Sequence, residues 1–345
     1  MPSAPPEAGR IRLATWNIEW FNALFDDHDR PLHDDQPSAR YKVTRGAQLA
    51  AIARVMHAMD ADGMMVIEAP DTNGRRSTVR ALEGFAQEMR LRTTRAMVGF
   101  PSETEQEIAF LWDPARLAAR HDPVETEGAP RFDRSFRYDL DTDAAPETIR
   151  FSKPPLEVAL AVPGHDLRLI GVHAKSKAPH GARSPDQAMR LAIENRRKQL
   201  AQCLWVRERV AAHLAAGDDL IVMGDFNDGP GLDEYERLFG QSGVEIVLGS
   251  AAEPRLRLQD PAAALTLGSR MGVTASTARF YLKPPGRYFE ALLDFIMVSP
   301  DLAARAPTWR IWHPFNDPLL AGDPVTRESL LVASDHFPVT IDLPI

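Results

Sequence analysis

The stretch that most constrains this chain runs from Leu220 to Gly231 and reads LIVMGDFNDGPG. Its leading apolar residues predict a short buried strand, and Gly224 ends that strand just before Asp225 and Asn227. A carboxylate and an amide two residues apart at the mouth of a buried strand can point into one site, where they suit a hard cation or a phosphate. Asp, Asn, Gly and Pro are also ordinary turn formers. Whether this stretch is a functional site therefore depends on whether polar residues also follow other strands of the chain.

Polar side chains follow apolar strands at several other points of the chain. Strands are predicted over 11–18, 63–67, 167–172, 291–298 and 337–343, in addition to 220–223. The polar residues at or beside the ends of these strands, or within them, are Asn17, Glu68, His173, Asp225, Asn227, Asp294, Asp335 and His336. Each alone has a structural explanation as a turn former or a surface hydrogen-bonding group. Together, and without paired cysteines, they indicate an oxygen-rich site for Mg²⁺, Mn²⁺ or Ca²⁺ rather than zinc.

The remaining periodicity predicts a mixture of helices and strands. Helices are expected over 42–59, 76–90, 184–216 and 232–239, and further strands over 94–100, 107–112, 149–162 and 244–248. Segment 22–40 is acidic and predicts a long loop, while 122–146 and the stretch from 249 to about 278 read as irregular. Two sheets faced by helices is the economical arrangement. We expect a flexible leader at 1–10 and one domain over 11–345.

Composition limits the possible partners and location. The net charge of -8 and pI of about 5.7 give no overall basic field, which argues against non-specific coating of nucleic acid but permits a nuclease with local charge. The single cysteine, Cys203, excludes an internal disulfide and fits a reducing compartment. No apolar run is long enough to span a membrane, and the N-terminus does not resemble a signal peptide. We therefore expect a cytoplasmic monomer without stable membrane association, unless a preceding segment has been removed.

Six short segments together resemble a known family. TWNIEW, VIEAP, GVHAKS, GDFND, LLDFIMVS and SDHFPV occur in the order found in the endonuclease/exonuclease/phosphatase superfamily, which includes deoxyribonuclease I. No single segment is decisive, but the combination is specific and spans residues 11–343. The resemblance implies an α/β (α+β) fold: a four-layer αββα sandwich of two packed mixed sheets flanked by helices. It also implies a metal-dependent phosphoesterase with its active site at one end of the sheets.

The resemblance and the chemistry of phosphodiester hydrolysis assign roles to the metal-binding residues. Glu68 is expected to be the principal ligand of Mg²⁺ or Mn²⁺, with Ca²⁺ as a further possibility. Asn17 and Asp335 would complete the shell or reach the metal through water. Relatives often carry Gln before the strand-end glutamate, whereas this chain has Ile67, which would remove one hydrogen-bonding partner from the site.

The catalytic residues are assigned in the same way. Asp225 would orient and deprotonate the attacking water, or hold a second metal, and Asn227 would position that water or a phosphate oxygen. His336, oriented by Asp294, would bind the scissile phosphate, and His173 would donate to a non-bridging oxygen.

Two lysines are candidates for binding the substrate phosphate. Lys153 stands where many nuclease-like relatives carry Arg, so it would bind phosphate as a point charge. Lys175 would add positive charge nearby, although an exposed lysine is the simpler interpretation of that position.

Three functional classes remain open from the sequence, two of them enzymes with different substrates. A nuclease acting on DNA or RNA is favoured by GDFND-GP and by two sets of basic residues, Arg75, Arg76 and Arg80, and Arg196, Arg197 and Lys198. A phosphodiesterase or phosphatase for small metabolites or lipid headgroups is favoured by the acidic charge and by loop 22–40, which would repel a polyanion. Against a lipid substrate, nothing in the sequence indicates an exposed aromatic membrane hairpin. A catalytically inactive adapter is disfavoured because every candidate group is present.

Overall fold

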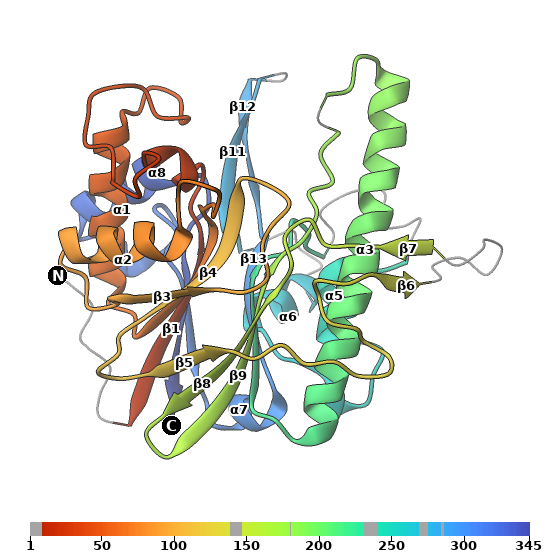
Figure 1. The fold of residues 1–345 in the computed structure, drawn as a ribbon. Helices are drawn as coiled ribbons and strands as arrows, with labels where there is room; N and C mark the ends of the chain where they lie inside the picture. The colour runs from red at the N-terminus through yellow and green to blue at the C-terminus, as the bar shows by residue number, and fades with distance from the viewer. Residues whose placement is uncertain (1–8, 139–146, 180, 231–239, 269–274, 284–285) are drawn as a thin grey trace.

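The computed structural model describes residues 9–138, 147–179, 181–230, 240–268, 275–283 and 286–345. Two sheets pack against each other in the middle of the molecule, and helices cover the outer side of each (Figure 1). The four-layer αββα arrangement predicted from the sequence is therefore confirmed. Residues 1–8 of the expected leader and the helix expected over 232–239 lie outside the described residues.

The first sheet has the strand order β14-β15-β1-β2-β4-β3. Its strands are β1 (Arg10–Asn17), β2 (Gly63–Pro70), β3 (Arg95–Val98), β4 (Gln106–Trp112), β14 (Thr308–Ile311) and β15 (Val339–Pro344). Strand β1 pairs in parallel with β2 and antiparallel with β15, so the sheet is mixed. Its outer face packs on α1 (Arg45–Met59), α2 (Thr78–Glu88), α8 (Pro324–Ala333) and the 3-10 turn η1 (Phe21–Leu24).

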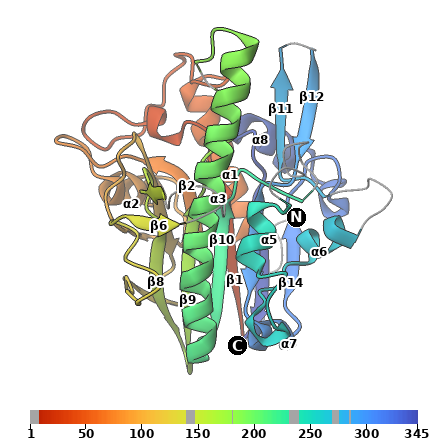
Figure 2. The same ribbon diagram turned by 90° about the vertical axis from the view of Figure 1, so that its right-hand side faces the viewer.

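The second sheet has the strand order β13-β10-β9-β8-β5. Its strands are β5 (Ala118–His121), β8 (Leu156–Val162), β9 (His165–His173), β10 (Leu220–Asp225) and β13 (Asp294–Val298). Helices α3 (Pro185–Ala216), α5 (Gly243–Leu248) and α6 (Pro261–Gly268) cover its outer side, and Figure 2 shows α3 running along β8, β9 and β10. The remaining described elements are β6 (Phe136–Tyr138), β7 (Glu147–Ile149), β11 (Ala278–Leu282), β12 (Arg287–Ala291), α7 (Pro300–Ala304), η2 (Pro254–Leu256) and η3 (Pro318–Leu320).

Burial on both faces explains why the central strands read as continuous apolar runs. In β10, Leu220 and Val222 pack under α3, while Ile221 and Met223 pack between the two sheets. Because successive side chains of a strand point to opposite faces, a strand in the middle of four layers has no solvent-facing side. These runs must end where a polar site begins, and Asp225 is the last residue of β10.

The helix predicted over 184–216 is confirmed as α3. Ser184 caps it by accepting a hydrogen bond from the Gln187 N–H, and Gly217 ends it in the left-handed conformation. The helices predicted over 42–59 and 76–90 are also confirmed, as α1 and α2. None of the helices in the described parts of the chain is long and apolar enough to cross a membrane.

Several element predictions were wrong. Residues 244–248 form helix α5 instead of a strand, because Ser242 and Glu245 make a capping box at its start. The single strand predicted over 149–162 is interrupted before β8, where two consecutive prolines lie. The strand predicted over 291–298 is also two elements, β12 and β13, so Asp294 begins a strand instead of standing within one. The stretch after 249, predicted to be irregular, contains α6.

Candidate active site

Three polar side chains lie side by side at one edge of the second sheet. His173 ends β9, Asp225 ends β10 and Asp294 begins β13, and all three are buried. The strand register places Asp225 opposite His173 on one side and opposite Asp294 on the other. Since β9 and β10 are parallel and β13 is antiparallel to β10, the start of β13 meets their carboxyl ends. The fold thus brings together these residues from three distant parts of the sequence.

The first sheet delivers its polar residues to the same place. Asn17 ends β1, opposite Ile67 of the parallel strand β2, and Glu68 follows Ile67 directly. The Asn17 Nδ2 donates a hydrogen bond of 3.0 Å to Asp225 Oδ2 and so joins the two sheets. The site therefore lies across the ends of both sheets, as the sequence predicted.

The segment before β15 is fixed to this edge by Ser334. The Ser334 hydroxyl donates to the backbone oxygen of Asn17 at 2.8 Å and accepts from the backbone N–H of His336 at 3.1 Å. The indole Nε1 of Trp16 also donates to the His336 backbone oxygen at 3.0 Å. These bonds between β1 and the segment before β15 place Asp335 and His336 beside Asn17.

Glu68 occupies an irregular position in its strand. Its φ is +63°, and the pairing of β2 with β4 shifts register between Ile67 and Ala69, which is a β-bulge. A positive φ is unfavourable for a residue with a side chain and is found most often at functional sites. In a regular strand the side chain of Glu68 would lie on the same face as that of Val66, which packs in the apolar core, and the bulge interrupts this alternation.

Gln106 supplies the hydrogen bond that Ile67 was expected to remove. Its Nε2 donates to Glu68 Oε2 at 2.6 Å, and its Oε1 accepts from Lys153 Nζ at 2.6 Å. Lys153 Nζ also lies 3.3 Å from His173 Nδ1. Because an ammonium group only donates, His173 Nδ1 acts as the acceptor, and the ring then carries its proton on Nε2. Burial first, and then the charge of Lys153, lower the pKa of His173, so this imidazole is neutral.

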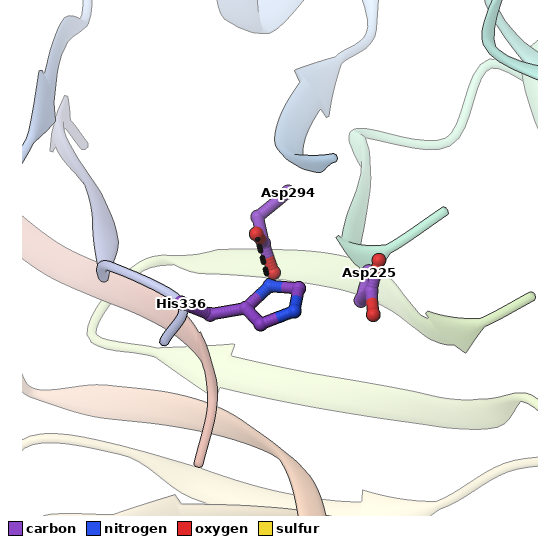
Figure 3. Close-up of side chains that lie close together, drawn as sticks. All are labelled: Asp225, Asp294 and His336. Atoms are coloured by element: carbon purple, nitrogen blue, oxygen red, sulfur yellow. Dashed lines mark hydrogen bonds and ion pairs between the residues drawn. The ribbon is translucent and has the colours of Figure 1, made fainter. Parts of the chain in front are cut away.

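Asp294, His336 and Asp225 form a second, charged group (Figure 3). His336 Nδ1 lies 2.8 Å from Asp294 Oδ2. Burial alone would lower the pKa of His336, but Asp294 and then Asp225 outweigh it and raise this pKa to about 10. Burial also raises the pKa of Asp225 to about 7, with Asp294 adding to the effect and His336 opposing it. At neutral pH the site therefore holds a buried imidazolium beside a carboxylate that can exchange a proton.

Two groups of residues could hold a divalent metal. Ligand atoms of Asp225, Asp294 and His336 all lie within 4.8 Å of one another, which makes them a possible site by proximity. An imidazole with a pKa of about 10 is protonated at neutral pH and has no lone pair for a metal. The predicted set of Asn17, Glu68 and Asp335 fits better. Asn17 Oδ1 is buried and has no hydrogen-bond partner among the described residues. The two hydrogen bonds that described residues donate to the Glu68 carboxylate both go to Oε2, so neither of them occupies Oε1.

The other predicted residues occupy the border of the site. Asn227 has a φ of +49°, and its Nδ2 donates to the Ala174 backbone oxygen and to Asp225 Oδ2, both at 3.1 Å. Its amide group therefore orients the Asp225 carboxylate. Lys175 is exposed, and its backbone N–H donates to Gln202 Oε1 of α3. The structure thus leaves the Lys175 side chain at the surface, close enough for its charge to affect the pKa of His173.

The basic residues expected to attract a polyanion do not form a free positive surface. Arg196 is buried, and its Nη1 lies 2.7 Å from Asp228 Oδ1, so its role is structural. Most of the other arginines in the two sets face a carboxylate: Arg75 pairs with Asp27, Arg80 with Asp29, Arg76 with Asp71 and Arg197 with Glu147. Arg75 and Arg80 partly neutralise aspartates of the acidic loop 22–40, and the carboxylates in turn partly neutralise the arginines, which corrects both charge arguments made from the sequence.

Sequence reasoning missed three residues that support the site. Gln106 is one, and Gln199 of α3 is another, since its Nε2 donates to the backbone oxygens of Phe226 and Asn227 at 3.1 and 2.9 Å. The Thr277 hydroxyl accepts the backbone N–H of Asp294 at 2.9 Å. Gln106 carried a usable signal, because it directly precedes the predicted strand 107–112 and so resembles the other polar residues at strand ends. Gln199 and Thr277 carried none.

Comparison with known proteins agrees with this geometry. The sequence profile described as the Endonuclease/Exonuclease/phosphatase family matches residues 14–336. The crystal structure of truncated Caenorhabditis elegans TDP2 superposes with a TM-score of 0.52 at 13% identity, covering 97% of this chain and 98% of that chain. D. rerio TDP2 complexed with single strand DNA product gives a TM-score of 0.51 at 11% identity, covering 97% and 99%. No curated protein matched the sequence.

Proposed function

Since the chain belongs to the Endonuclease/Exonuclease/phosphatase family and is a phosphoric ester hydrolase, we propose that it is a nuclease that cleaves phosphodiester bonds of DNA or RNA. The observation that carries the proposal is the buried group in which Asp225, with a pKa of about 7, stands near the His336 imidazolium. Hydrolysis of a phosphodiester needs a base for the attacking water and positive charge at the phosphate. This pair supplies both within one water-poor site.

Three further side chains orient Asp225 and His336 or act beside them. Asp294 keeps His336 cationic and fixes the orientation of its ring through Nδ1, which leaves Nε2 to donate to a phosphate oxygen. Asn227 orients the Asp225 carboxylate. His173 carries its proton on Nε2, which lies 3.7 Å from Asp225 Oδ2 at the site, and can donate it to a non-bridging phosphate oxygen.

A divalent cation, Mg²⁺ or Mn²⁺, fits the oxygen donors on the other side of the site. Glu68, Asp335 and the Asn17 Oδ1, which has no hydrogen-bond partner in the part of the chain that the structure describes, would hold it. When bound, it would neutralise negative charge that develops on the phosphate oxygens. Lys153, held by Gln106, adds a fixed positive charge beside this ligand set.

Two observations support a nucleic-acid substrate over a small metabolite. The acidic loop, which favoured a small substrate, is neutralised in part by Arg75 and Arg80, so it does not exclude a polyanion. The fold is also similar to that of a D. rerio TDP2 described in complex with a single strand DNA product. A small phosphodiester or phosphomonoester is the second candidate, and the net charge of -8 favours it.

The experiment compares supercoiled plasmid, single-stranded DNA, RNA and bis-p-nitrophenyl phosphate in Mg²⁺, Mn²⁺ or EDTA. The test variant is Asp225→Asn, which keeps the shape of the side chain and removes its charge. The matched control is Asp166→Asn, an exposed aspartate near the start of β9, where it pairs with Ala161 of β8. We expect metal-dependent cleavage of nucleic acid that the control retains and Asp225→Asn loses.

Other outcomes would change the assignment. Turnover of only the small diester would contradict the nuclease proposal and favour a metabolite or lipid phosphodiesterase. Full activity of Asp225→Asn would show that the assigned base is wrong. Full activity in EDTA, after prior removal of bound metal, would contradict the proposed metal dependence.

A further inference from the structure

The hairpin formed by β11 and β12 stands out from the end of the sheets that holds the site (Figures 1 and 2). Four of its large apolar side chains are exposed: Tyr281, Leu282, Tyr288 and Phe289. Nothing in the sequence indicated an exposed aromatic membrane hairpin, whereas the structure shows a hairpin with exposed aromatic side chains. Exposed aromatic surface is unfavourable in water and commonly marks a binding surface.

The base of the hairpin is bonded directly to the catalytic segment. The Arg279 N–H donates to the Asp335 backbone oxygen at 2.8 Å, and the Phe337 N–H donates to the Thr277 backbone oxygen at 2.6 Å. Thr277 also accepts the Asp294 N–H through its hydroxyl. The hairpin is therefore positioned by the same short segments that position His336, and its orientation relative to the site is fixed at its base.

One face of the hairpin leads outward from His336. The register pairs Ala278 with Ala291, Phe280 with Phe289 and Leu282 with Arg287, and opposed residues of an antiparallel pair share a face. Ala278 and Ala291 are buried at the base, and the Phe280 ring lies edge-on to the His336 ring at 5.5 Å between centroids. Beyond Phe280 this face, which we call the catalytic face, presents Phe289, Leu282 and Arg287 to solvent.

Side-chain contacts on the opposite face of the hairpin stabilise it. There Tyr281 and Tyr288 form a cross-strand pair with ring centroids 5.3 Å apart, and the Arg279 guanidinium stacks on Tyr288 at 3.7 Å. Such pairs stabilise a two-stranded hairpin, which is marginal alone. Phe289, 38% exposed on the catalytic face, is not needed for that pairing network.

The charge of the hairpin suits an anionic polymer. Lys283 and Arg287 are exposed, and neither forms an ion pair within the described residues, whereas the Glu290 carboxylate lies 3.2 Å from Arg279. Elsewhere around the site the arginines of α2 and the preceding turn face aspartates. The hairpin thus presents, beside its aromatic rings, two cations that form no ion pair with any described residue.

We propose that the catalytic face of the hairpin is a stacking platform for an unpaired base next to the scissile phosphate, with Phe289 under the base and Arg287 facing the backbone. The proposal rests on the proposed nuclease function. Aromatic rings combined with cations bind single strands because each base has a planar face and each nucleotide a charge. The face starts at the His336 ring, so a strand whose phosphate lies there passes over Phe280 and Phe289.

The test measures binding of a fluorescent single-stranded oligonucleotide and of a blunt duplex by anisotropy, using the full chain in EDTA. The variants are Phe289→Ala and Phe289→Trp, and the matched control is Tyr41→Ala, an exposed aromatic residue outside the hairpin. We expect Phe289→Ala to weaken single-strand binding roughly 5- to 100-fold, which is the range for one stacked base. Phe289→Trp should retain binding, the control should change it less than about twofold by the same reasoning, and duplex binding should change little.

The outcomes separate the two proposals. If the wild-type protein cleaves single-stranded DNA but Phe289→Ala binds it as the wild type does, the platform proposal is wrong and the nuclease proposal stands. If the wild type cleaves only bis-p-nitrophenyl phosphate, the nuclease proposal fails first. Binding of anionic phosphatidylserine vesicles that depends on Phe289, without an effect on nucleic acid, would assign the hairpin to a lipid surface and overturn the platform. Thermal unfolding of each variant checks that it is folded.

Discussion

Replacing Gln106 with leucine tests whether this residue positions Glu68, the proposed metal ligand. Gln106 makes two hydrogen bonds to charged partners, one to the Glu68 carboxylate and one from the Lys153 ammonium, each 2.6 Å long. A hydrogen bond to a charged group contributes about 1.5–3 kcal/mol. Burial, the largest effect, raises the pKa of Glu68, and Lys153 opposes it. Gln106→Leu would leave the carboxylate without its shortest hydrogen bond and would free Lys153 to move.

The expected result is a weaker metal site. Loss of a partner that orients a metal ligand typically costs about 10–100-fold in metal affinity or activity. The assay is hydrolysis of a phosphodiester as a function of Mg²⁺ concentration, and the half-saturating concentration should rise by about that factor. Saturating metal should restore part of the kcat, which a global loss of structure would not allow. The matched control is Glu105→Gln, at an exposed neighbouring position.

A particular result would refute this reasoning. If Gln106→Leu keeps the wild-type half-saturating Mg²⁺ concentration and the wild-type kcat, then Gln106 does not position Glu68. If kcat falls equally at all metal concentrations, Gln106 acts through Lys153 on the phosphate and not through the metal ligand. Gln106→Asn, which keeps the amide but shortens the side chain, should show a similar but smaller defect.

Three further predictions follow from the same network of contacts. Asp294→Asn should lower the pKa of His336, which Asp294 and Asp225 hold near 10, so the alkaline limb of the kcat/KM profile should move to lower pH; an unchanged limb would contradict this. Arg196→Met should reduce the free energy of unfolding by about 3 kcal/mol in urea denaturation, because it removes a buried partner of Asp228. Lys175→Ala should raise KM a few-fold at low salt, roughly as one exposed charge allows, without changing kcat, and the difference should vanish in high salt.

The clustering of the candidate residues could be predicted from the sequence to a large extent, because strand geometry places each of them at a strand end. Each central strand is buried on both faces, so a polar residue such as Asp225 at the end of an apolar run marks the edge of its sheet. Parallel strands bring their carboxyl ends to one edge, which is why His173 and Asp225 meet without any information on long-range contacts. The order of the six motifs along the chain indicated the family, and the family resemblance then assigned expected roles to the individual residues.

The residues that support the site could not be predicted in this way. Gln199 lies on a helix that packs across the second sheet, and nothing in its own neighbourhood distinguishes it from other buried polar residues of α3. Gln106 replaces, from the neighbouring strand, a hydrogen bond that relatives were expected to make from the position of Ile67. The exchange is visible only in the register of β2 and β4, where the bulge at Glu68 faces the start of β4.

The proposed function requires that a chain with a net charge of -8 act on a polyanion, and the charge distribution is compatible with this. Exposed pairs such as Arg75–Asp27 are screened and contribute little at long range. The cations proposed to contact the scissile phosphate are at the site, where His336 is buried and Lys153 is held by Gln106, and a charge in such surroundings acts strongly over a few ångströms. Few counterions would be released from the substrate, so the affinity for nucleic acid should fall only gradually with salt. Recognition then depends on contacts at the scissile phosphate and its neighbouring base more than on attraction from a distance.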